Sequence, residues 1–354
     1  MPDIVVVGAG IVGSSVAYHL ARGGASVTLV EGKSSPARGV TGDSFAWIGQ
    51  DSGQWPGGAR DLRGSVLADH RGLEDTVPGY AVRRTGSLTW PAPDGGERAA
   101  PGEAGPAPGS RRVTGAEVAA LEPGLLDVPE YAVHTPSDAG VDPVAATRAL
   151  VAAARAHGAR VVHDASVTSL DTARGRVRGV STAAGFLPAG TVVLAAGTGT
   201  RALCEPLGID LPVAVSPACV LEVAAPAGSV HGIVAAPEFE VREVRPGRLL
   251  VVAPCPADGP VPPARVLGEG AMRSLRAAFR GGADWRLLDC RVGARPVPAR
   301  GPLIGHLTRD RSLYTAVLHS AVTLAPTVGR LVAGELLGNG PARELRDCRP
   351  GGPA

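Results

Sequence analysis

The sequence has few cysteines, and they are poorly placed for cross-linking or for binding a metal. The five are widely spaced, odd in number and include no CxxC pair. This pattern indicates neither a disulfide framework nor a zinc site, so we predict no metal, and reduced thiols in a cytoplasm are the expected state. The five are Cys204, Cys219, Cys255, Cys290 and Cys348.

Long apolar runs are also missing. No uninterrupted apolar run reaches the about 18 residues that a membrane helix needs. The chain begins with the strand-like DIVVV instead of a basic stretch followed by a long apolar run. We therefore expect no export signal, no membrane span and a cytoplasmic location.

An excess of one charge is missing too. Thirty-five basic residues stand against 33 acidic ones, which gives a net charge of +2, and there is no long run of Lys or Arg. Nucleic acid is therefore not expected as a partner. Apolar residues make up 44% of the chain and charged residues 19%, which is ordinary for a globular enzyme. With 354 residues, the chain is expected to form two domains.

A glycine-rich motif near the N-terminus is the clearest functional signal. The motif GAGIVG runs from Gly8 to Gly13, follows a short apolar run and opens a helical pattern from Ile11 to Arg22. A second apolar run ends at Glu31, 23 positions after Gly8. Together these features form a βαβ unit of about 30 residues and predict a dinucleotide site.

Each position of this unit has an expected role. Gly8 makes the tight turn, Gly10 lets the backbone approach a pyrophosphate, and Gly13 lets the helix pack closely on the strand. The helix N-terminus stabilises the phosphate charge. Glu31 accepts hydrogen bonds from the adenosine ribose and disfavours the 2′-phosphate of NADP. The alternative for the glycine motif is a turn that binds no ligand, and the alternative for Glu31 is a solvated carboxylate at the end of a strand. The predicted contacts also include Ile11, Val12 and Gly32.

The glycines do not separate FAD from NAD, because both cofactors use the same phosphate geometry. The later segment from Thr191 to Leu203, TVVLAAGTGTRAL, is a buried-strand pattern that ends in Ala-Ala-Gly. It resembles the second nucleotide-contacting strand of flavoproteins and therefore favours FAD. Ala196 and Gly197 are its predicted cofactor contacts.

The α/β pattern returns twice along the chain. Asp142, Pro143 and Gly158 bracket a helix as N-cap, first-turn proline and C-terminal stop. Three strand-like runs follow, VTSL, RVRGVST and TVVLAAG. Near the C-terminus, LYTAVL predicts a strand and PTVGRLVAGELLG a helix closed by Gly338.

Two stretches, roughly 78–136 and 213–291, differ in character. They are richer in proline and in isolated β-like runs, so we interpret them as two pieces of one inserted domain. Within the first stretch, the segment from Pro91 to Ser110 is dominated by Pro, Gly and Ala and predicts an exposed loop.

Four segments together carry a family resemblance. They are GAGIVG with Glu31; GVTGDSFAWIG from Gly39 to Gly49; SDAGVDPVAATRAL from Ser137 to Leu150; and GARPVPARGPLIG followed by LYTAVLHSAVTLAPTVGRLVAGELL. In order and spacing they resemble the D-amino-acid oxidase superfamily of FAD oxidoreductases, which includes glycine and sarcosine oxidases and many amino-acid dehydrogenases. The segment SFAWIG resembles a subgroup of uncharacterised members more closely than it resembles the best-known oxidases.

The resemblance implies an α/β fold in which a Rossmann-like FAD-binding domain carries an inserted, β-sheet-rich substrate domain. We expect the FAD-binding domain at residues 1–77, 137–212 and 292–354, and the substrate domain at 78–136 and 213–291.

The resemblance also implies cofactor contacts. Thr41 to Ser44 are expected along the pyrophosphate and isoalloxazine, with turn capping as the alternative for Thr41 and Ser44. Val167 is expected to contact the adenine through its backbone. The strand-to-helix turn LHSAVTLAP is expected to direct peptide N–H groups and a positive helix end at the flavin pyrimidine edge, or else to be a plain packed turn. The turn residues predicted to contact the flavin are Ser320, Ala321, Val322, Thr323 and Leu324.

Two residues are the predicted catalytic pair. The resemblance implies that Arg295, in GARPVP, holds a substrate carboxylate, a role that suits the forked guanidinium, and Arg291 is the alternative. For His319 the alternatives are a residue that binds substrate, one that titrates near neutral pH, and a structural histidine whose ring bonds the backbone. Trp47 either lines the pocket or belongs to the core.

Two departures from the sarcosine oxidases concern the cofactor and the electron acceptor. No cysteine lies in GARPVP, where those enzymes attach flavin covalently, so noncovalent FAD is expected. Their oxygen-activating lysine has no counterpart, because Lys33 is the only lysine and belongs to the nucleotide region. The sequence therefore does not choose between oxygen and another, unknown compound as the electron acceptor.

The sequence thus predicts an enzyme that oxidises the C–N bond of a small amino acid or secondary amine by hydride transfer to flavin N5, giving an imine. One alternative is an FAD-dependent 2-hydroxy-acid dehydrogenase of the same fold, for which His319 is the candidate base. A biosynthetic tailoring flavoenzyme and a noncatalytic flavin-binding or partner-binding protein are the others.

Overall fold

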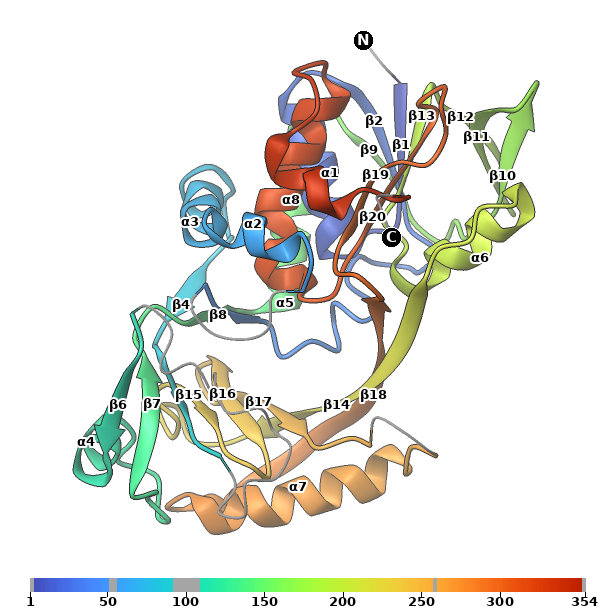
Figure 1. The fold of residues 1–354 in the computed structure, drawn as a ribbon. Coiled ribbons are helices and arrows are strands. Elements are labelled where there is room, and N and C mark those ends of the chain that lie inside the picture. The colour runs from blue at the N-terminus through green and yellow to red at the C-terminus, as the bar shows by residue number, and fades with distance from the viewer. Residues whose placement is uncertain (1–2, 51–55, 92–108, 257–259, 352–354) are drawn as a thin grey trace.

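The structure is a computed structural model that describes residues 3–50, 56–91, 109–256 and 260–351. In Figure 1 a layered α/β half lies above a half dominated by one large sheet, and two long strands, β14 (Val213–Ala224) and β18 (Arg286–Pro298), lead from one half into the other. The predicted loop from Pro91 to Ser110 lies almost entirely outside the described residues.

A six-stranded sheet is the centre of the upper half. Its order is β19-β20-β13-β1-β2-β9, and every neighbouring pair is parallel except β19 with β20. Buried β-branched residues dominate the central strands, as expected for a sheet that is covered on both faces. The strands are β1 (Asp3–Val7), β2 (Ser26–Val30), β9 (Arg160–Val162), β13 (Thr191–Leu194), β19 (Leu303–His306) and β20 (Leu313–Val317).

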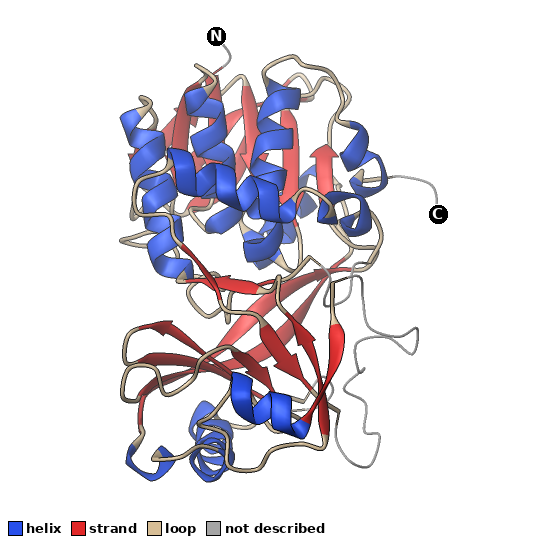
Figure 2. Ribbon diagram, turned by 90° about the vertical axis from the view of Figure 1, so that its left-hand side faces the viewer, coloured by secondary structure: helices blue, strands red, loops and turns tan. Residues whose placement is uncertain are grey.

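Helices cover one face of this sheet and a small sheet covers the other. Helix α1 (Ile11–Arg22) packs between α5 (Pro143–Ala156) and α8 (Ala321–Leu336), and the three bury one apolar core against the sheet. Figure 2 shows these helices in front of the strands. The opposite core lies under the antiparallel strands β10 (Val167–Ala173), β11 (Arg176–Thr182) and β12 (Gly185–Pro188) and under α6 (Thr200–Cys204).

The local signals in α1 and α5 are confirmed. Helix α1 has the predicted bounds. At the start of α5, the Asp142 carboxylate accepts hydrogen bonds from the N–H groups of Val144 and Ala145, both at 3.0 Å, and Pro143 occupies the first turn. The helix ends at Ala156, two residues before Gly158.

The prediction for α8 was wrong at its start. The helix begins at Ala321, so Pro326 lies inside it. Pro326 removes one backbone hydrogen bond, but the helix persists because both of its faces are packed in the core. The predicted stop is confirmed, since Gly338 follows the C-cap Leu337 with a φ of +96°.

The lower half is built on an eight-stranded sheet of order β18-β14-β17-β16-β15-β5-β7-β6. Helix α7 (Ala264–Ala278) covers its outer face over a second apolar core. Neither α7 nor the short α4 (Gly115–Leu121) was predicted. The strands are β5 (Ser87–Thr89), β6 (Arg111–Thr114), β7 (Tyr131–Thr135), β14 (Val213–Ala224), β15 (Ile233–Ala235), β16 (Glu240–Arg245), β17 (Arg248–Ala253) and β18 (Arg286–Pro298).

A three-stranded sheet, β3-β8-β4, joins the halves. Its strands are β3 (Trp47–Ile48), β4 (Val82–Arg84) and β8 (Ala139–Val141), and α2 (Ala59–Arg63) and α3 (Val66–Thr76) lie near it in the chain. The described residues also form short 3₁₀ turns at Gly197–Gly199, Glu205–Leu207, Gly282–Asp284 and Arg343–Cys348.

The fold class is therefore as predicted: a Rossmann-like α/β domain with a sheet-rich insertion. The exact domain boundaries stay a prediction, because β18 runs across the predicted limit between residues 291 and 292. Within the described ranges, no helix is both long enough and apolar enough to cross a membrane. The same ranges contain no group of three or more His, Cys, Asp or Glu side chains arranged to hold a metal.

Candidate functional site

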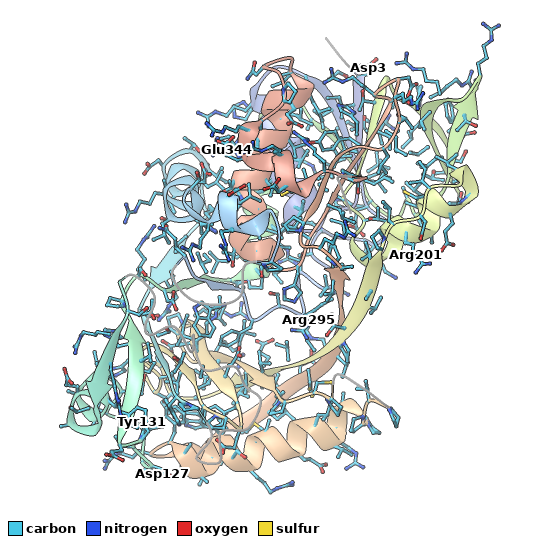
Figure 3. All side chains as sticks on the ribbon, in the orientation of Figure 1. Asp3, Asp127, Tyr131, Arg201, Arg295 and Glu344 are labelled. Carbon is cyan, nitrogen blue, oxygen red and sulfur yellow. The ribbon has the colours of Figure 1, made fainter. Side chains whose placement is uncertain are left out.

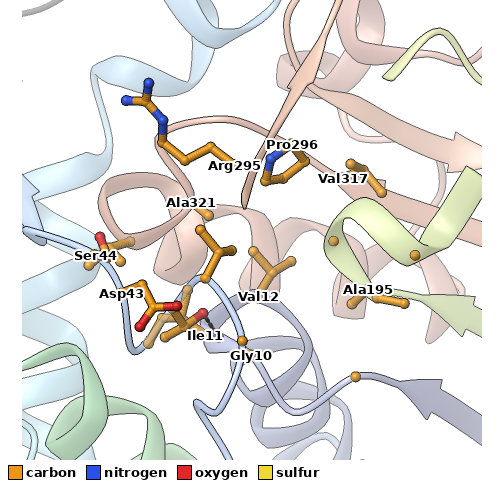
Figure 4. Close-up of a pocket in the computed structure, with 18 of the residues that line it drawn as sticks. Gly10, Ile11, Val12, Asp43, Ser44, Ala195, Arg295, Pro296, Val317 and Ala321 are labelled. Carbon is orange, nitrogen blue, oxygen red and sulfur yellow. Dashed lines mark hydrogen bonds between the residues drawn. The ribbon is translucent and has the colours of Figure 1, made fainter. Parts of the chain in front are cut away.

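A cavity of ≈ 1070 Å³ lies between the two halves. Its wall contains residues from the six-stranded sheet, from the loop around Thr41 and from the eight-stranded sheet (Figure 4). All predicted cofactor and catalytic residues line it except Gly13 and Leu324. The volume is at the upper end of the range for ligand pockets, so there is room for a large cofactor as well as a small substrate.

The glycine turn after β1 leaves no space for side chains. Gly8 has a φ of +101°, and a Cβ there would lie 2.6 Å from the carbonyl oxygen of Ala195. A Cβ at Gly13 would lie 2.0 Å from the carbonyl oxygen of Gly8. Gly13 thus acts through packing, in agreement with the role expected of it, and this packing places the start of α1 at the cavity.

The N-terminus of α1 is open toward the cavity. Its N-cap, Gly10, has no side chain to accept a hydrogen bond. The N–H of Ile11 donates to Oγ1 of Thr41 at 3.1 Å. The N–H groups of Val12 and Gly13 have no acceptor within their own helix. Together with the positive helix end, these donors fit a bound phosphate.

Glu31 lies where β2 ends, and two backbone groups orient its carboxylate. One oxygen accepts from the N–H of Ala9 at 2.8 Å and the other from the N–H of Lys33 at 2.9 Å. Gly32 and Val167 line the same end of the cavity. The arrangement fits the ribose and adenine of a dinucleotide.

The segment after β13 lines the cavity on the other side of β1 from the end of β2, where Glu31 lies. Ala196 and Gly197 line the cavity, and Gly197 has a φ of +58°, which turns the chain from the strand into a 3₁₀ turn. The backbone at this point is therefore close to any dinucleotide that lies on the start of α1.

The segment from Ser44 to Trp47 is a rigid part of the wall. Oγ of Ser44 accepts from the N–H of Ala46 at 3.1 Å. Nε1 of Trp47 donates to the buried carboxylate of Asp138 at 2.9 Å, and the carbonyl oxygen of Trp47 accepts from the Thr323 hydroxyl at 2.8 Å. Trp47 lines the cavity, so of the two sequence interpretations the structure favours the pocket wall.

Arg295 projects from β18 at the junction of the two halves (Figure 3). Its Nη2 donates to Oγ of Ser216 at 2.9 Å and to the carbonyl oxygen of Pro217 at 3.1 Å. Its Nε is buried and has no hydrogen-bond partner among the described residues. Burial lowers the pKa of this guanidinium, which nevertheless stays charged at neutral pH. A partly buried guanidinium in the wall of a cavity is suited to an anionic ligand.

Arg291 occupies a different place. It does not line the cavity, and it pairs with the carboxylates of Asp43 at 3.4 Å and Asp289 at 3.0 Å. Asp43 does line the cavity, and burial raises the pKa of its carboxyl while the Arg291 charge opposes that rise. Asp43 lies within the range from Thr41 to Ser44 that was expected along the cofactor, but the sequence indicated neither its role nor its ion pair with Arg291.

His319 lies beside the Arg295 charge. Its Nδ1 is 3.3 Å from Oγ of Ser320. The residue is exposed through the open cavity, yet partial desolvation of the ring lowers its pKa, and Arg295 lowers it further. The ring is therefore neutral at pH 7 and is able to accept a proton.

The N-terminus of α8 also faces the cavity. Ser320, its N-cap, has a φ of +44°, and its side chain makes no capping hydrogen bond. Ala321, Val322 and Thr323 line the cavity. The N–H of Leu324 donates to the carbonyl oxygen of Ser320 at 3.1 Å, so this N–H is not available to a cofactor, and Leu324 does not line the cavity.

Sequence reasoning missed the apolar side of the cavity. Phe45, Ala218, Val220 and Val252 line it. They come from a loop and from two strands that are far apart in the sequence, so no local motif brings them together.

Comparison with known proteins gives one consistent result. A family model described as FAD dependent oxidoreductase (DAO) matches residues 3–335. Glycine oxidase from Bacillus licheniformis is 28% identical over 95% of this chain and 93% of its own. D-amino acid dehydrogenase 2 from Pseudomonas aeruginosa is 28% identical over 99% of this chain and 98% of its own. The crystal structure of iminodiacetate oxidase from Chelativorans sp. BNC1 is similar with a TM-score of 0.77 and 26% identity, covering 96% of each chain.

Proposed function

The chain belongs to the DAO family of FAD-dependent oxidoreductases, and we propose that it oxidises the C–N bond of a small amino acid or secondary amine that carries a carboxylate. The observation that carries this proposal is the guanidinium of Arg295 in the cavity wall, whose hydrogen bonds to Ser216 and Pro217 come from Nη2 alone. When bound, FAD accepts a hydride from the carbon that bears the amine, which leaves an imine that water hydrolyses.

The residues of this chain bind and orient the reactants. The start of α1 and Thr41 would hold the pyrophosphate, and Glu31 would hold the ribose. The N–H groups at the start of α8, from Ala321 to Thr323, would stabilise negative charge on the flavin. The remaining predicted contacts, Ser44, Val167, Ala196 and Gly197, line the same cavity and would contact the same cofactor.

Arg295 fixes the substrate. Ser216 and Pro217 accept from Nη2 of its guanidinium, and Nη1 is the nitrogen that would donate to a carboxylate oxygen. Hydrogen bonds from Nη1 and the charge of the guanidinium would orient the carboxylate and therefore the reacting C–H bond. The amine must lose its proton before oxidation, and the neutral ring of His319 is placed to accept it.

The electron acceptor is proposed to be something other than oxygen. Lys33 is the only lysine, and its backbone pairs with Glu31 at the nucleotide end of the cavity. The reacting end therefore has no lysine to stabilise reduced oxygen. A relative described as a D-amino acid dehydrogenase agrees with this proposal.

The visible spectrum of the FAD-loaded protein tests the function. Anaerobic addition of amino acids is expected to bleach the flavin, while the matching 2-hydroxy acids leave it oxidised. Protein that cannot be loaded with FAD, or flavin that no amine bleaches, would contradict the proposal. Arg295→Met is expected to weaken binding of a carboxylate about 100-fold. Arg286→Met is the matched control and should change it little, because Arg286 is exposed on the same strand and does not line the cavity.

A further inference from the structure

The first turn of α8 is weakly held by its own helix. Its N-cap, Ser320, has a φ of +44°, and the side chain makes no capping hydrogen bond. Pro326 has no N–H, so the carbonyl of Val322 lacks the partner that an unbroken helix would give it. The later turns are fixed by packing, since a Cβ at Gly329 would lie 2.2 Å from Oγ of Ser15 on α1. The turn that faces the cavity therefore depends on contacts from outside the helix.

Two such contacts reach Thr323, the third residue of the helix. Its hydroxyl donates to the carbonyl oxygen of Trp47 at 2.8 Å, and its own carbonyl oxygen lies 3.0 Å from Nε2 of His70. Trp47 and Thr323 line the cavity, whereas His70 does not. His70 belongs to α3, 253 positions earlier in the chain. It therefore acts on the cavity only through the backbone of α8.

The hydrogen bonds of the neutral His70 ring have one possible direction. A carbonyl oxygen only accepts, so Nε2 carries the proton, and Nδ1 accepts from the Tyr80 hydroxyl at 3.0 Å. Burial lowers the pKa of His70 to about 4, so the ring is neutral at pH 7. Only 1% of His70 and 4% of Tyr80 is exposed, so water does not compete for either bond. A fixed chain of hydrogen bonds thus leads from Tyr80 through His70 to Thr323.

Helix α3 is itself fastened to α8. The Asp69 carboxylate accepts from Nε and Nη2 of Arg330 at 2.8 and 2.9 Å. The N–H of Val82 donates to Oε1 of Glu74 at 2.9 Å, which ties the segment after α3 back to this helix. The ring of His70 is therefore held in a rigid frame when it meets the first turn of α8.

From these contacts we propose that His70 is a positioning residue for the flavin. Its Nε2–H holds the carbonyl of Thr323, so the N–H groups from Ala321 to Thr323 stay directed at the place where the flavin gains negative charge on reduction. This role rests on the proposed function, because it needs the flavin pyrimidine edge at the start of α8. Well-placed donors bind the reduced flavin more tightly than the oxidised one, so the reduction potential reports on them. A purely structural histidine would affect stability and leave the potential unchanged.

The variant His70→Leu tests the role directly, because it removes both hydrogen bonds and keeps a side chain of similar size. Graded chemical reduction with dyes of known potential measures the FAD-loaded protein. The potential should fall by about 30 mV, which corresponds to a tenfold loss of preference for the reduced flavin. His70→Gln, whose side-chain amide supplies a donor in place of Nε2–H, should recover most of that loss. An unchanged potential in His70→Leu would overturn the inference.

Tyr80→Phe and Tyr314→Phe form a matched pair, since each removes one buried hydroxyl that helps to hold α8. Tyr314 donates to Glu335 at 2.7 Å, near the other end of the helix, and does not line the cavity. Tyr80→Phe should cost about threefold in the same preference, or about 15 mV, and Tyr314→Phe should cost nothing. Equal falls in the pair would show general loosening and overturn the inference. If His70→Leu does not fold, the pair decides: a fall in Tyr80→Phe alone supports the inference, and no fall overturns it.

Hydrogen exchange in the FAD-loaded protein gives a readout without any redox step. The N–H of Leu324, which donates to Ser320 at 3.1 Å, reports on the first turn of α8. It should exchange about tenfold faster in His70→Leu and as before in Tyr314→Phe. Faster exchange with an unchanged potential would show that the turn does not act on the flavin, and would overturn the inference. Neither measurement uses an amine, so a failure of this role and a failure of amines to bleach the flavin are seen separately.

Discussion

The guanidinium of Arg242 donates from Nε to the carbonyl oxygen of Phe45 at 2.7 Å, across the junction of the two halves. Its Nη2 donates to the carbonyl oxygen of Val141 at 2.5 Å, and the group lies 5.3 Å from the centroid of the Phe45 ring. Only 2% of Arg242 is exposed, and burial lowers its pKa to about 9. A charged residue of the eight-stranded sheet thus holds the segment around Phe45, which lines the cavity, in place.

Replacing Arg242 by Met is expected to lower the free energy of unfolding by roughly 3 kcal/mol, because two buried carbonyl groups lose their donor. The loop at Phe45 should also loosen, which weakens FAD binding. Urea unfolding and FAD titration measure the two effects. Arg242→Lys, which keeps one charged donor, should recover part of both.

Arg245→Met is the matched control for Arg242→Met. It is on the same strand but is exposed, and its partner is the surface carboxylate of Glu222. We expect a change below about 0.5 kcal/mol. Equal losses for Arg242→Met and Arg245→Met would contradict the positioning role of Arg242.

Acid should destabilise the protein through His70. The ring is buried, with Nε2 3.0 Å from the carbonyl oxygen of Thr323 and Nδ1 3.0 Å from the Tyr80 hydroxyl. Burial lowers its pKa from 6.5 to about 4. Between these two values the unfolded chain binds a proton that the folded chain does not, so stability is lost as the pH falls.

The loss due to His70 should approach roughly 3 kcal/mol as the pH falls from 7 to 4. Urea unfolding at several pH values measures it. His70→Gln should be less stable at pH 7 but should show a shallower decline with acid. An identical slope for the two proteins would show that other groups carry the acid sensitivity.

Glu31→Gln should raise the dissociation constant for FAD about tenfold, because a charged acceptor for the ribose becomes neutral. The variant keeps one oxygen for the N–H of Ala9. Flavin fluorescence titration measures the change. Glu205→Gln, a surface carboxylate paired with Arg201, is the control and should bind FAD as the unaltered protein does.

The dinucleotide half was predictable because its signals are local. The turn at Gly8, the cap at Asp142 and the strand that ends at Glu31 each depend on neighbours within a few residues. Arg295 and the start of α8 were located only through resemblance. Pro326 misled the helix prediction, because the packing that offsets its lost hydrogen bond is tertiary.

The half built on the eight-stranded sheet was far less predictable. Arg295 on β18, Val220 on β14 and Val252 on β17 line one cavity through a register that the whole sheet sets. In the sequence, Arg242 cannot be told from a surface arginine, because its burial follows from contacts with residues about 100 and 200 positions away. Pairing at such distances has no local signature, so the ion pair of Asp43 with Arg291 and the apolar residues of the cavity wall were missed.

The flavin is expected to be bound noncovalently, and acid precipitation tests this prediction. The supernatant should be yellow and the pellet colourless. Cys255 is the cysteine that lines the cavity among the described residues, so Cys255→Ser is the informative variant. Colour that stays in the pellet would contradict the prediction, and its loss in Cys255→Ser would identify that thiol as the attachment point.

His319→Ala separates amine oxidation from oxidation of a 2-hydroxy acid. A hydroxyl at its ordinary pKa needs a base, so the hydroxy-acid reaction should fall at least about 100-fold in this variant. Amines lose their proton to water far more readily, so their oxidation should fall about tenfold or less.

The pH dependence of the rate gives a second test of His319. Because the pKa of His319 lies below its ordinary value, a reaction that needs the neutral ring should keep its rate at pH 7 and lose it only under acid conditions. Anaerobic bleaching rates from pH 5 to 9, with an amino acid and with its hydroxy analogue, measure both. If the fall in rate at low pH is absent in His319→Ala, proton transfer is assigned to His319. If the same fall is seen in both proteins, the titrating group is the substrate amine.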